Sequence, residues 1–196
     1  MPKEKIRCQW AGDSDLMRAY HDTEWGTPQH SDRILFEYIV LDSFQAGLSW
    51  ITIRKKRDNF RAAFAGFDPS VVAGWGEKDI DRLLADPGII RHRGKIEATI
   101  TNAQAWQRIE QAGGFNRFLW DYMDGAPLQN SWASQAEVPT QTDLSERISK
   151  DLKKAGFRFC GPTIVYAFME AVGMVNDHVV GCHRHDAVAA MGANTA

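Results

Sequence analysis

The sequence has 196 residues, a formal net charge of −2 at pH 7 and only three cysteines. This length suits one compact domain, and 44% hydrophobic residues with 24% charged residues exclude a disordered chain. No apolar stretch is long enough to span a bilayer, and the charged N-terminus lacks a signal-peptide pattern. Because an odd, low cysteine count argues against a disulfide framework, we expect a cytoplasmic globular protein with no membrane association.

Capping residues and apolar spacing indicate helices along nearly the whole chain, so we predict an all-α fold. The first two expected helices begin at Asp13 or Ser14 and at Ser31 or Asp32. The next three run from Ser49 to Gly66, over 77–85 and from about Arg91 to Gly113. The last three cover 115–123, centre on 144–152 and run from Gly161 to Gly173. No alternating window exceeds about four residues, so strands are hard to place. We expect the polar, proline-containing segment 124–141 to be a loop that divides residues 1–196 into two helical lobes of a single domain.

Cysteine and histidine pairs stand at both ends of the chain. Cys8 and His21 form one pair, and His178 and Cys182 form the other. Two thiolates and two imidazoles are the closed ligand set of a structural zinc site. If the second pair is helical, its H-x3-C spacing puts both residues on one face. Spacing alone leaves buried thiols without metal as the alternative, and two histidines just after Cys182 offer substitute ligands.

Asp42 continues the apolar stripe of the helix that begins near Ser31. A carboxylate on such a stripe either has an ion-pair partner or faces a pocket, and the sequence leaves both open. The first fifty residues also contain Trp10, Tyr20 and Trp50, which are either core residues or the walls of that pocket. Aromatic faces beside one acid suit a flat ligand that is cationic or forms hydrogen bonds.

Residues 84–96 contain the pattern of a helix, a glycine-containing hairpin and a basic helix N-terminus. Free backbone N–H groups at such a terminus bind phosphate, and Arg91, Arg93 and Lys95 add positive charge. This is the arrangement of a helix-hairpin-helix motif, with a plain structural turn as the alternative. Basic clusters at 54–57 and 150–158 further indicate a positive side on a mildly acidic chain.

Four segments closely resemble the DNA-3-methyladenine glycosylase I family: YHDTEWG at 20–26, QAGLSWI at 45–51, GIIRHRGKI at 88–96 and VNDHVVGC at 175–182. The resemblance runs from about Cys8 to Cys182. It implies a helix-hairpin-helix DNA glycosylase fold in which a structural Zn²⁺ joins the N- and C-terminal segments through Cys8, His21, His178 and Cys182. It also implies a monomer that removes 3-methyladenine from alkylated double-stranded DNA by hydrolysing the N-glycosidic bond after base flipping.

The resemblance assigns roles to individual residues as well. It implies that Asp42 and Tyr20 are catalytic residues at the edge of the base and that Trp50, Trp10 and Gln45 bind the base. The DNA-binding residues that it implies are Gly47, Leu48, Gly88, Ile90, Arg91, Arg93, Gly94 and Lys95.

One departure from the family pattern lies in the pocket. The family's usual acid there is a glutamate, whereas this chain has Asp42, which is one methylene shorter. Two alternatives therefore stay open beside 3-methyladenine excision. One is a glycosylase-fold protein for a different damaged base, and the other is a zinc-stapled DNA-binding module without catalysis.

Overall fold

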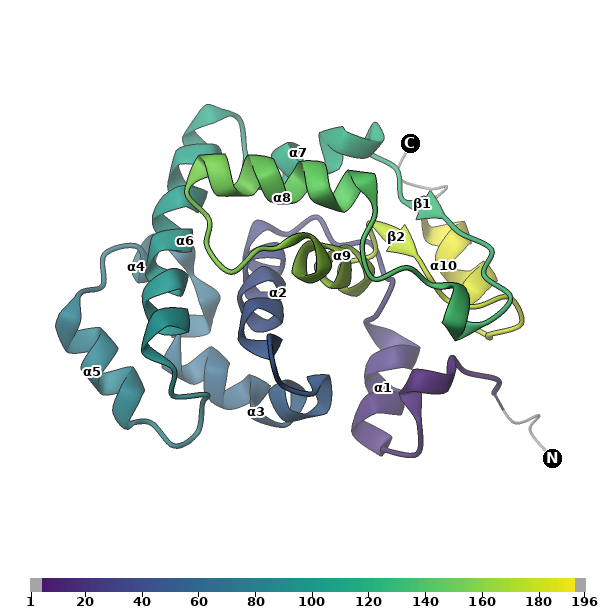
Figure 1. The fold of residues 1–196 in the computed structure, drawn as a ribbon, viewed down its shortest axis with the longest axis horizontal. Coiled ribbons are helices and arrows are strands. Elements are labelled where there is room, and N and C mark those ends of the chain that lie inside the picture. Colours follow the sequence, from purple (N-terminus) through teal and green to yellow (C-terminus); the bar gives the residue numbers. More distant parts are fainter. Residues whose placement is uncertain (1–4, 193–196) are drawn as a thin grey trace.

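The computed structural model describes residues 5–192, and its elements are mostly helices (Figure 1). In chain order they are η1 (Gln9–Ala11), α1 (Asp15–Thr23), α2 (Asp32–Gln45), α3 (Trp50–Ala63), η2 (Ala65–Phe67), α4 (Pro69–Val72), α5 (Glu77–Ala85), α6 (Arg93–Ala112), α7 (Phe115–Trp120), η3 (Asp121–Met123), β1 (Leu128–Gln129), η4 (Gln135–Glu137), α8 (Asp143–Ala155), α9 (Pro162–Ala171), β2 (Val175–Asn176) and α10 (His185–Gly192). The prediction of a mostly helical chain is confirmed.

Backbone conformation at the flanking residues marks several helix ends. Ser14, Ser31 and Ser49 each precede a helix in an extended conformation, which is the usual backbone of an N-cap residue. Gly156 ends α8 with a φ of 104°, a left-handed conformation that favours glycine. The short helices α4 and α10 were not predicted, and the helix expected over 115–123 is α7 followed by the 3₁₀ turn η3.

One strand of a small parallel sheet, β1, lies within the segment that the sequence predicts as a loop. Leu128 pairs with Val175 and Gln129 pairs with Asn176. Strands of two residues are too short to produce an alternating pattern, so the sequence carries no signal for them. The pairing attaches the 124–141 segment to β2, directly before His178.

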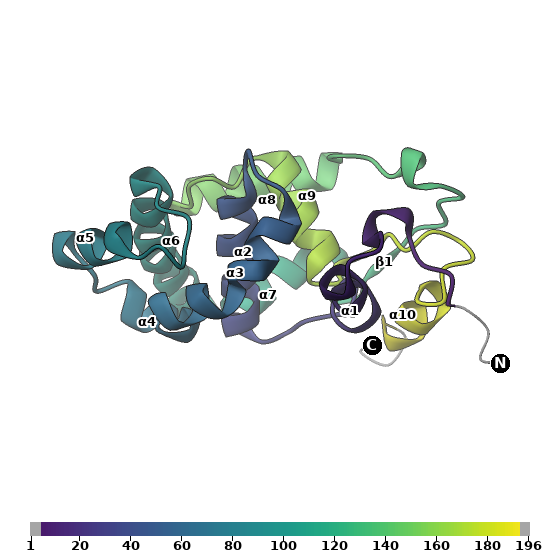
Figure 2. The same cartoon turned by 90° about the horizontal axis from the view of Figure 1, so that it is seen from below.

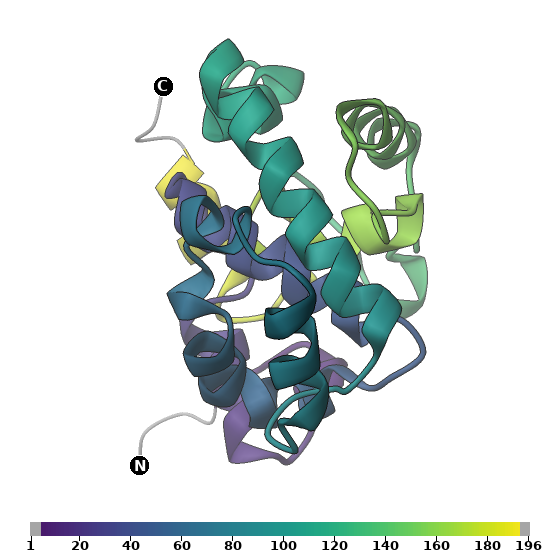
Figure 3. The same ribbon diagram turned by 90° about the vertical axis from the view of Figure 1, so that its left-hand side faces the viewer.

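Helix α2 occupies the centre of the molecule and packs against α9, α3 and α6. Ten of its residues are buried, in one continuous run from Leu35 to Phe44, so its apolar surface is not confined to one face. The views from below and from the side show α2 enclosed by the other helices (Figures 2 and 3). Within residues 5–192, no helix combines the length and apolar character needed to cross a membrane.

The segments near the two ends of the chain lie side by side. In Figure 1, α1 and η1 lie close to β2 and α10. The backbone N–H of His183 donates to the carbonyl of Ile6 at 2.9 Å, and that of Gly26 donates to the carbonyl of Glu170 at 3.0 Å. This arrangement brings together the cysteine and histidine pairs that are far apart in the sequence.

Candidate functional site

A cavity of about 560 Å³ lies among η1, α1, α2, α3, η4 and α9. The five residues predicted to form the base pocket all line it: Trp10, Tyr20, Asp42, Gln45 and Trp50. The structure therefore brings these five side chains to one place, and their roles in base binding stay predictions.

Aromatic rings form much of the cavity wall. The Tyr20 ring centre lies 6.0 Å from that of Trp10 and 5.7 Å from that of Trp50. Trp25 packs edge-on against Trp10 at 4.8 Å. The indole N–H groups of Trp10 and Trp50 are buried and have no hydrogen-bond partner within residues 5–192. Buried donors without a partner are rare in folded proteins, which sets these two indole groups apart.

Asp42 is the acid of this cavity. Its residue exposure is 2%, and its Oδ2 atom is buried without a hydrogen-bond partner in the described part of the chain. Burial raises the pKa of the Asp42 carboxyl well above its ordinary value. No salt bridge reaches it from residues 5–192. The sequence left open whether Asp42 has an ion-pair partner or faces a pocket, and the structure favours the pocket.

Glu170 is a second acid of the cavity, and sequence reasoning did not assign it a role. Burial, the neighbouring Asp177 and the more distant Asp42 all raise the pKa of Glu170 well above its ordinary value. Asp177 in turn accepts a 2.6 Å hydrogen bond from the hydroxyl of Tyr166. The available signal was that Glu170 is the one acid within the apolar stretch 164–175.

The basic cluster 54–57, expected on the positive surface, instead turns partly inward. Arg54 and Arg57 are buried, and both bind the carboxylate of Glu24. Arg57 also binds Glu37, which is itself buried. The prediction of an exposed basic run at 54–57 is therefore wrong for these two arginines, because Glu24 in the turn after α1 and Glu37 on α2 neutralise them.

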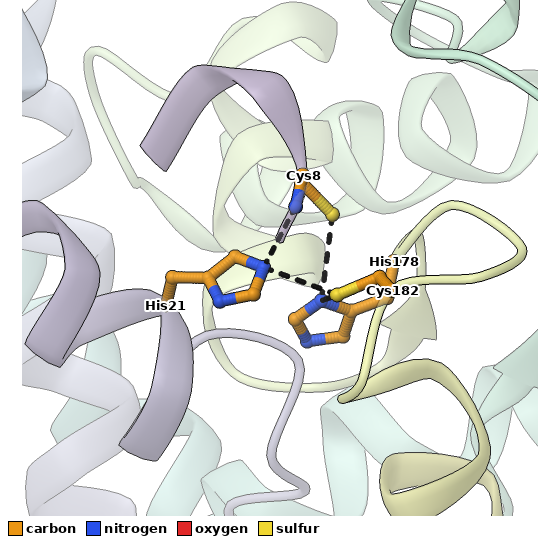
Figure 4. Close-up of side chains that lie close together, drawn as sticks. All are labelled: Cys8, His21, His178 and Cys182. Carbon is orange, nitrogen blue, oxygen red and sulfur yellow. Dashed lines mark hydrogen bonds between the residues drawn. The ribbon is translucent and has the colours of Figure 1, made fainter. Parts of the chain in front are cut away.

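The predicted metal ligands Cys8, His21, His178 and Cys182 converge on one buried point (Figure 4). The Cys182 sulfur lies 3.4 Å from His21 Nε2 and 3.6 Å from His178 Nδ1, and the Cys8 sulfur lies 3.6 Å from His178 Nδ1. Tetrahedral coordination by sulfur and nitrogen separates such neighbouring ligand atoms by about 3.5 Å. This group therefore has the chemistry and spacing to hold a metal ion.

The other ring nitrogen of each histidine is also engaged. His21 Nδ1 lies 2.9 Å from a carboxylate oxygen of Asp22, and His178 Nε2 lies 3.1 Å from the carbonyl oxygen of Trp25. Such contacts orient ligating imidazoles and select the tautomer that leaves the opposite nitrogen free for a metal. The segment from His178 to Cys182 is a turn rather than a helix, so the helical explanation for this pair is wrong. His183 lies beside Asp22, and His185 binds Asn130.

The segment between α5 and α6 is a tightly held hairpin. The Lys56 ammonium donates to the carbonyls of Pro87 at 3.0 Å and Gly88 at 3.1 Å. The Gly88 N–H donates to Asp86 Oδ1 at 2.7 Å, and a Cβ at this glycine would lie 2.9 Å from the same oxygen. A side chain at position 88 would therefore have to displace the Asp86 carboxylate. Ile90 is half-buried at the end of the hairpin.

The predicted DNA-binding residues at the start of α6 differ in whether their polar groups are already engaged within the protein. Within residues 5–192, the backbone N–H groups of Arg91, Arg93 and Gly94 have no hydrogen-bond partner. The Arg91 side chain is exposed and forms no ion pair there. The Arg93 side chain binds three carboxylates, those of Glu77, Asp81 and Glu97, which neutralise it.

The position of Lys95 differs clearly from the predicted role of its side chain in DNA binding. Its residue exposure is 6%, and its ammonium donates to the carbonyls of Phe44 and Ala46, each at 2.7 Å. Burial lowers the pKa of Lys95. The side chain is therefore committed to the end of α2 and is not available to a phosphate.

The α2–α3 loop adjoins Lys95 and the cavity. Gly47 has a φ of 82°, which favours glycine, and the Leu48 side chain is 41% exposed. The N–H of Leu48 donates to the carbonyl of Gln45 at 2.6 Å. This tight turn places an exposed apolar side chain directly beside a cavity residue.

Comparison with known proteins places these features in a family. Residues 10–185 match the methyladenine glycosylase family. DNA-3-methyladenine glycosylase 1 of Escherichia coli (strain K12) is 52% identical, covering 90% of this chain and 95% of the relative. DNA-3-methyladenine glycosylase of Haemophilus influenzae (strain ATCC 51907 / DSM 11121 / KW20 / Rd) is 45% identical, covering 90% and 96%.

Solved structures agree with the sequence comparisons. A crystal structure of 3-methyladenine DNA glycosylase I matches with a TM-score of 0.90 and 52% identity, covering 92% of this chain and 100% of that chain. A structure of the Staphylococcus aureus enzyme, solved to explain 3-methyladenine recognition, matches with a TM-score of 0.89 and 39% identity, covering 91% and 96%.

Proposed function

Because this chain belongs to the methyladenine glycosylase family, we propose that it excises 3-methyladenine from alkylated double-stranded DNA in base-excision repair. The observation that carries the proposal is the cavity lined by Trp10, Asp42 and Trp50, in which each of these residues has a buried polar atom without a hydrogen-bond partner in residues 5–192. A flipped, flat base with hydrogen-bonding groups at its edge would satisfy such atoms between aromatic faces.

Charge gives this pocket a means of discrimination. Methylation at N3 makes the adenine base of the nucleotide cationic, whereas unmodified adenine is neutral. The faces of Tyr20 and Trp50 favour a cation, and the buried Asp42 carboxyl supplies a counter-charge. In the empty pocket burial favours the protonated acid, and a cationic base would lower the pKa of Asp42 again. The pocket would therefore bind the damaged base more tightly than the normal one.

The same charge simplifies the chemistry. When the N-glycosidic bond breaks, its electron pair stays with the base, which departs as neutral 3-methyladenine. The sugar becomes an oxocarbenium ion beside the DNA phosphates, and water adds to it with loss of a proton, leaving an abasic site. Because the leaving group is already activated, little acid catalysis is needed from Asp42 or Tyr20, and their task is to hold the base in place.

We propose that the buried cluster of Cys8, His21, His178 and Cys182 holds a structural zinc ion. The support is the Cys2His2 donor set, the 3.4–3.6 Å spacing of its sulfur and nitrogen atoms and the engaged second nitrogen of each imidazole. Bound there, zinc would cross-link the ends of the chain. With all four positions filled by protein side chains, it would take no part in bond cleavage.

We also propose that α5, the 86–92 hairpin and α6 act as a helix-hairpin-helix motif. Free N–H groups at Arg91, Arg93 and Gly94 support phosphate binding at the start of α6. Leu48 would enter the gap that the flipped nucleotide leaves in the duplex. Action as a monomer in the cytoplasm stays a prediction from the family resemblance.

Incubation with methylated duplex DNA, followed by chromatographic identification of the freed base, tests this function. We expect 3-methyladenine to be released and an abasic site to remain. Release of a different methylated base would point instead to altered specificity. Binding to duplex DNA that contains an abasic site, without release of any base, would point to a non-catalytic DNA-binding module.

A further inference from the structure

Phe159 is an exposed aromatic residue with an unusual backbone. Its φ is 54°, in the left-handed region that non-glycine residues seldom adopt, and 38% of the residue is exposed. It lies in the connection between α8 and α9. A strained, solvent-exposed phenylalanine is unfavourable on two counts, which raises the question of what the arrangement serves.

Three buried polar side chains hold this connection in place. Asn102 of α6 accepts from the N–H of residue 158 at 2.7 Å and donates to the same residue's carbonyl at 3.1 Å. The Ser43 hydroxyl of α2 lies 3.0 Å from the carbonyl oxygen of residue 159 and 2.7 Å from that of Ile39, so these two acceptors share its one proton. Ser149 of α8 donates to the carbonyl of residue 160 at 2.7 Å. Side chains from three different helices thus contact the backbone of residues 158–160. The Phe159 ring is presented on a rigid backbone, as a preorganised contact requires.

The Phe159 ring lies beside the start of α6. Its centre is 6.3 Å from that of the His92 ring, and a Cβ at Gly94 would lie 3.9 Å from its Cζ atom. Ser43, which holds the carbonyl of Phe159, follows the cavity acid Asp42 directly in α2. The connection between α8 and α9, the α2–α3 loop and the start of α6 lie on one side of the molecule, on the right in Figure 3.

The charge around Phe159 suits a polyanion. Arg158 and Arg91 are both exposed, and neither side chain forms an ion pair with any residue between 5 and 192. By contrast, acids neutralise Arg54, Arg57 and Arg93. Unpaired guanidinium groups beside an exposed aromatic ring match nucleic acid, because phosphates pair with the cations and bases stack on the ring.

We propose that Phe159 is a second apolar contact to duplex DNA, which packs against a base or deoxyribose exposed beside the flipped nucleotide. Leu48 and Phe159 then approach the distorted duplex from two loops on one face, and the N–H groups at the start of α6 bind its backbone. This proposal rests on the proposed function, since it needs a DNA substrate, and it adds a residue from the far end of the chain to the DNA surface.

The test measures affinity for a duplex that contains an abasic-site analogue, together with the rate of 3-methyladenine release under subsaturating enzyme. Phe159→Asn is the main variant, because asparagine tolerates the left-handed backbone and removes the ring. Phe159→Trp keeps an aromatic ring, and Val71→Ala removes a comparably exposed apolar side chain, 48% exposed on α4, away from this face.

We expect Phe159→Asn to weaken duplex binding about tenfold, as loss of one stacking contact does, and to slow release in proportion. Phe159→Trp and Val71→Ala should stay within about twofold of wild type, and all four proteins should share one melting temperature. Wild-type affinity in a folded Phe159→Asn variant overturns this proposal while leaving the proposed function intact. A wild-type chain that neither binds duplex DNA nor releases a base overturns both.

Discussion

The guanidinium carbon of Arg54 lies 4.4 Å from the centre of the Tyr20 ring. The same guanidinium binds the carboxylate of Glu24 at 2.6 Å, and Glu24 also accepts a 2.7 Å hydrogen bond from Tyr38. On another side, the Tyr20 ring meets Trp50 at the cavity. A chain of contacts therefore links an ion pair in the interior to the wall of the base pocket.

The Glu24 ion pairs predict a specific pH dependence of stability. Burial alone would raise the pKa of Glu24, but hydrogen bonds from Arg54, Tyr38 and Arg57 outweigh it and lower the pKa from its ordinary 4.5 to about 2. A lowered pKa in the folded state contributes stability above pH 4.5 that is lost as the pH falls toward 2. Glu24→Gln should therefore be less stable than wild type at pH 7 and approach it near pH 2. Denaturant unfolding across this range checks the prediction, and a constant difference contradicts it.

The contribution of Asp42 to stability should change with pH in the opposite direction to that of Glu24. Burial raises its pKa, so the unfolded chain ionises this group at a lower pH than the folded protein does. The stability that Asp42 contributes is then greatest in acid and declines as the pH rises through 3.8 toward the folded-state pKa. We expect Asp42→Asn to raise the melting temperature at pH 7, because it removes a buried acid that forms no ion pair with residues 5–192. Calorimetry decides this, and a lower melting temperature would show that Asp42 has a stabilising partner in the free protein.

The metal proposal predicts one zinc ion per chain. Cys8→Ser combined with Cys182→Ser should abolish zinc binding and lower the melting temperature, because the ends of the chain lose their cross-link. Cys160→Ala is the matched control, since this buried thiol lies outside the ligand group and should retain full zinc content. Elemental analysis by mass spectrometry measures the metal. Unchanged zinc content in the double variant is incompatible with this site.

Substitutions of Arg91 and Lys95 should have different effects on the salt dependence of DNA binding. Arg91 is exposed and unpaired within residues 5–192, so Arg91→Ala should reduce the slope of log affinity against log salt by about one. Lys95 binds two carbonyls at the end of α2, so Lys95→Met should lower the melting temperature and leave that slope unchanged. Duplex binding at several salt concentrations separates the two roles. A reduced slope for Lys95→Met would mean that its ammonium reaches a phosphate after all.

Residue type and the family resemblance together predicted the parts of the site in which the chemistry is distinctive. Two cysteines and two histidines are a possible zinc set, and the resemblance indicated that they form one cluster, although the segment from His178 to Cys182 is a turn rather than a helix. Asp42 stood out because an acid interrupts an apolar stripe. Helices with clear caps, such as α2 after Ser31, were likewise predictable from local sequence.

Features that depend on long-range packing were not predictable in this way. Lys95 and Arg91 look equivalent in the sequence, and only the position of the α2 carbonyls decides that one is buried and the other exposed. Glu170 faces the cavity because α9 packs against α2, which no local pattern indicates. Phe159 owes its exposure to side chains from three other helices.

The most direct test of the account is the single-turnover rate of 3-methyladenine release from methylated duplex by wild type, Asp42→Asn and Asp42→Glu, each in saturating excess over the DNA. The account predicts release by wild type, a rate at least about tenfold lower for the asparagine variant, which lacks the counter-charge, and retained activity for the glutamate variant. Equal rates for Asp42→Asn and wild type would contradict the claim that this buried carboxyl recognises a cationic base.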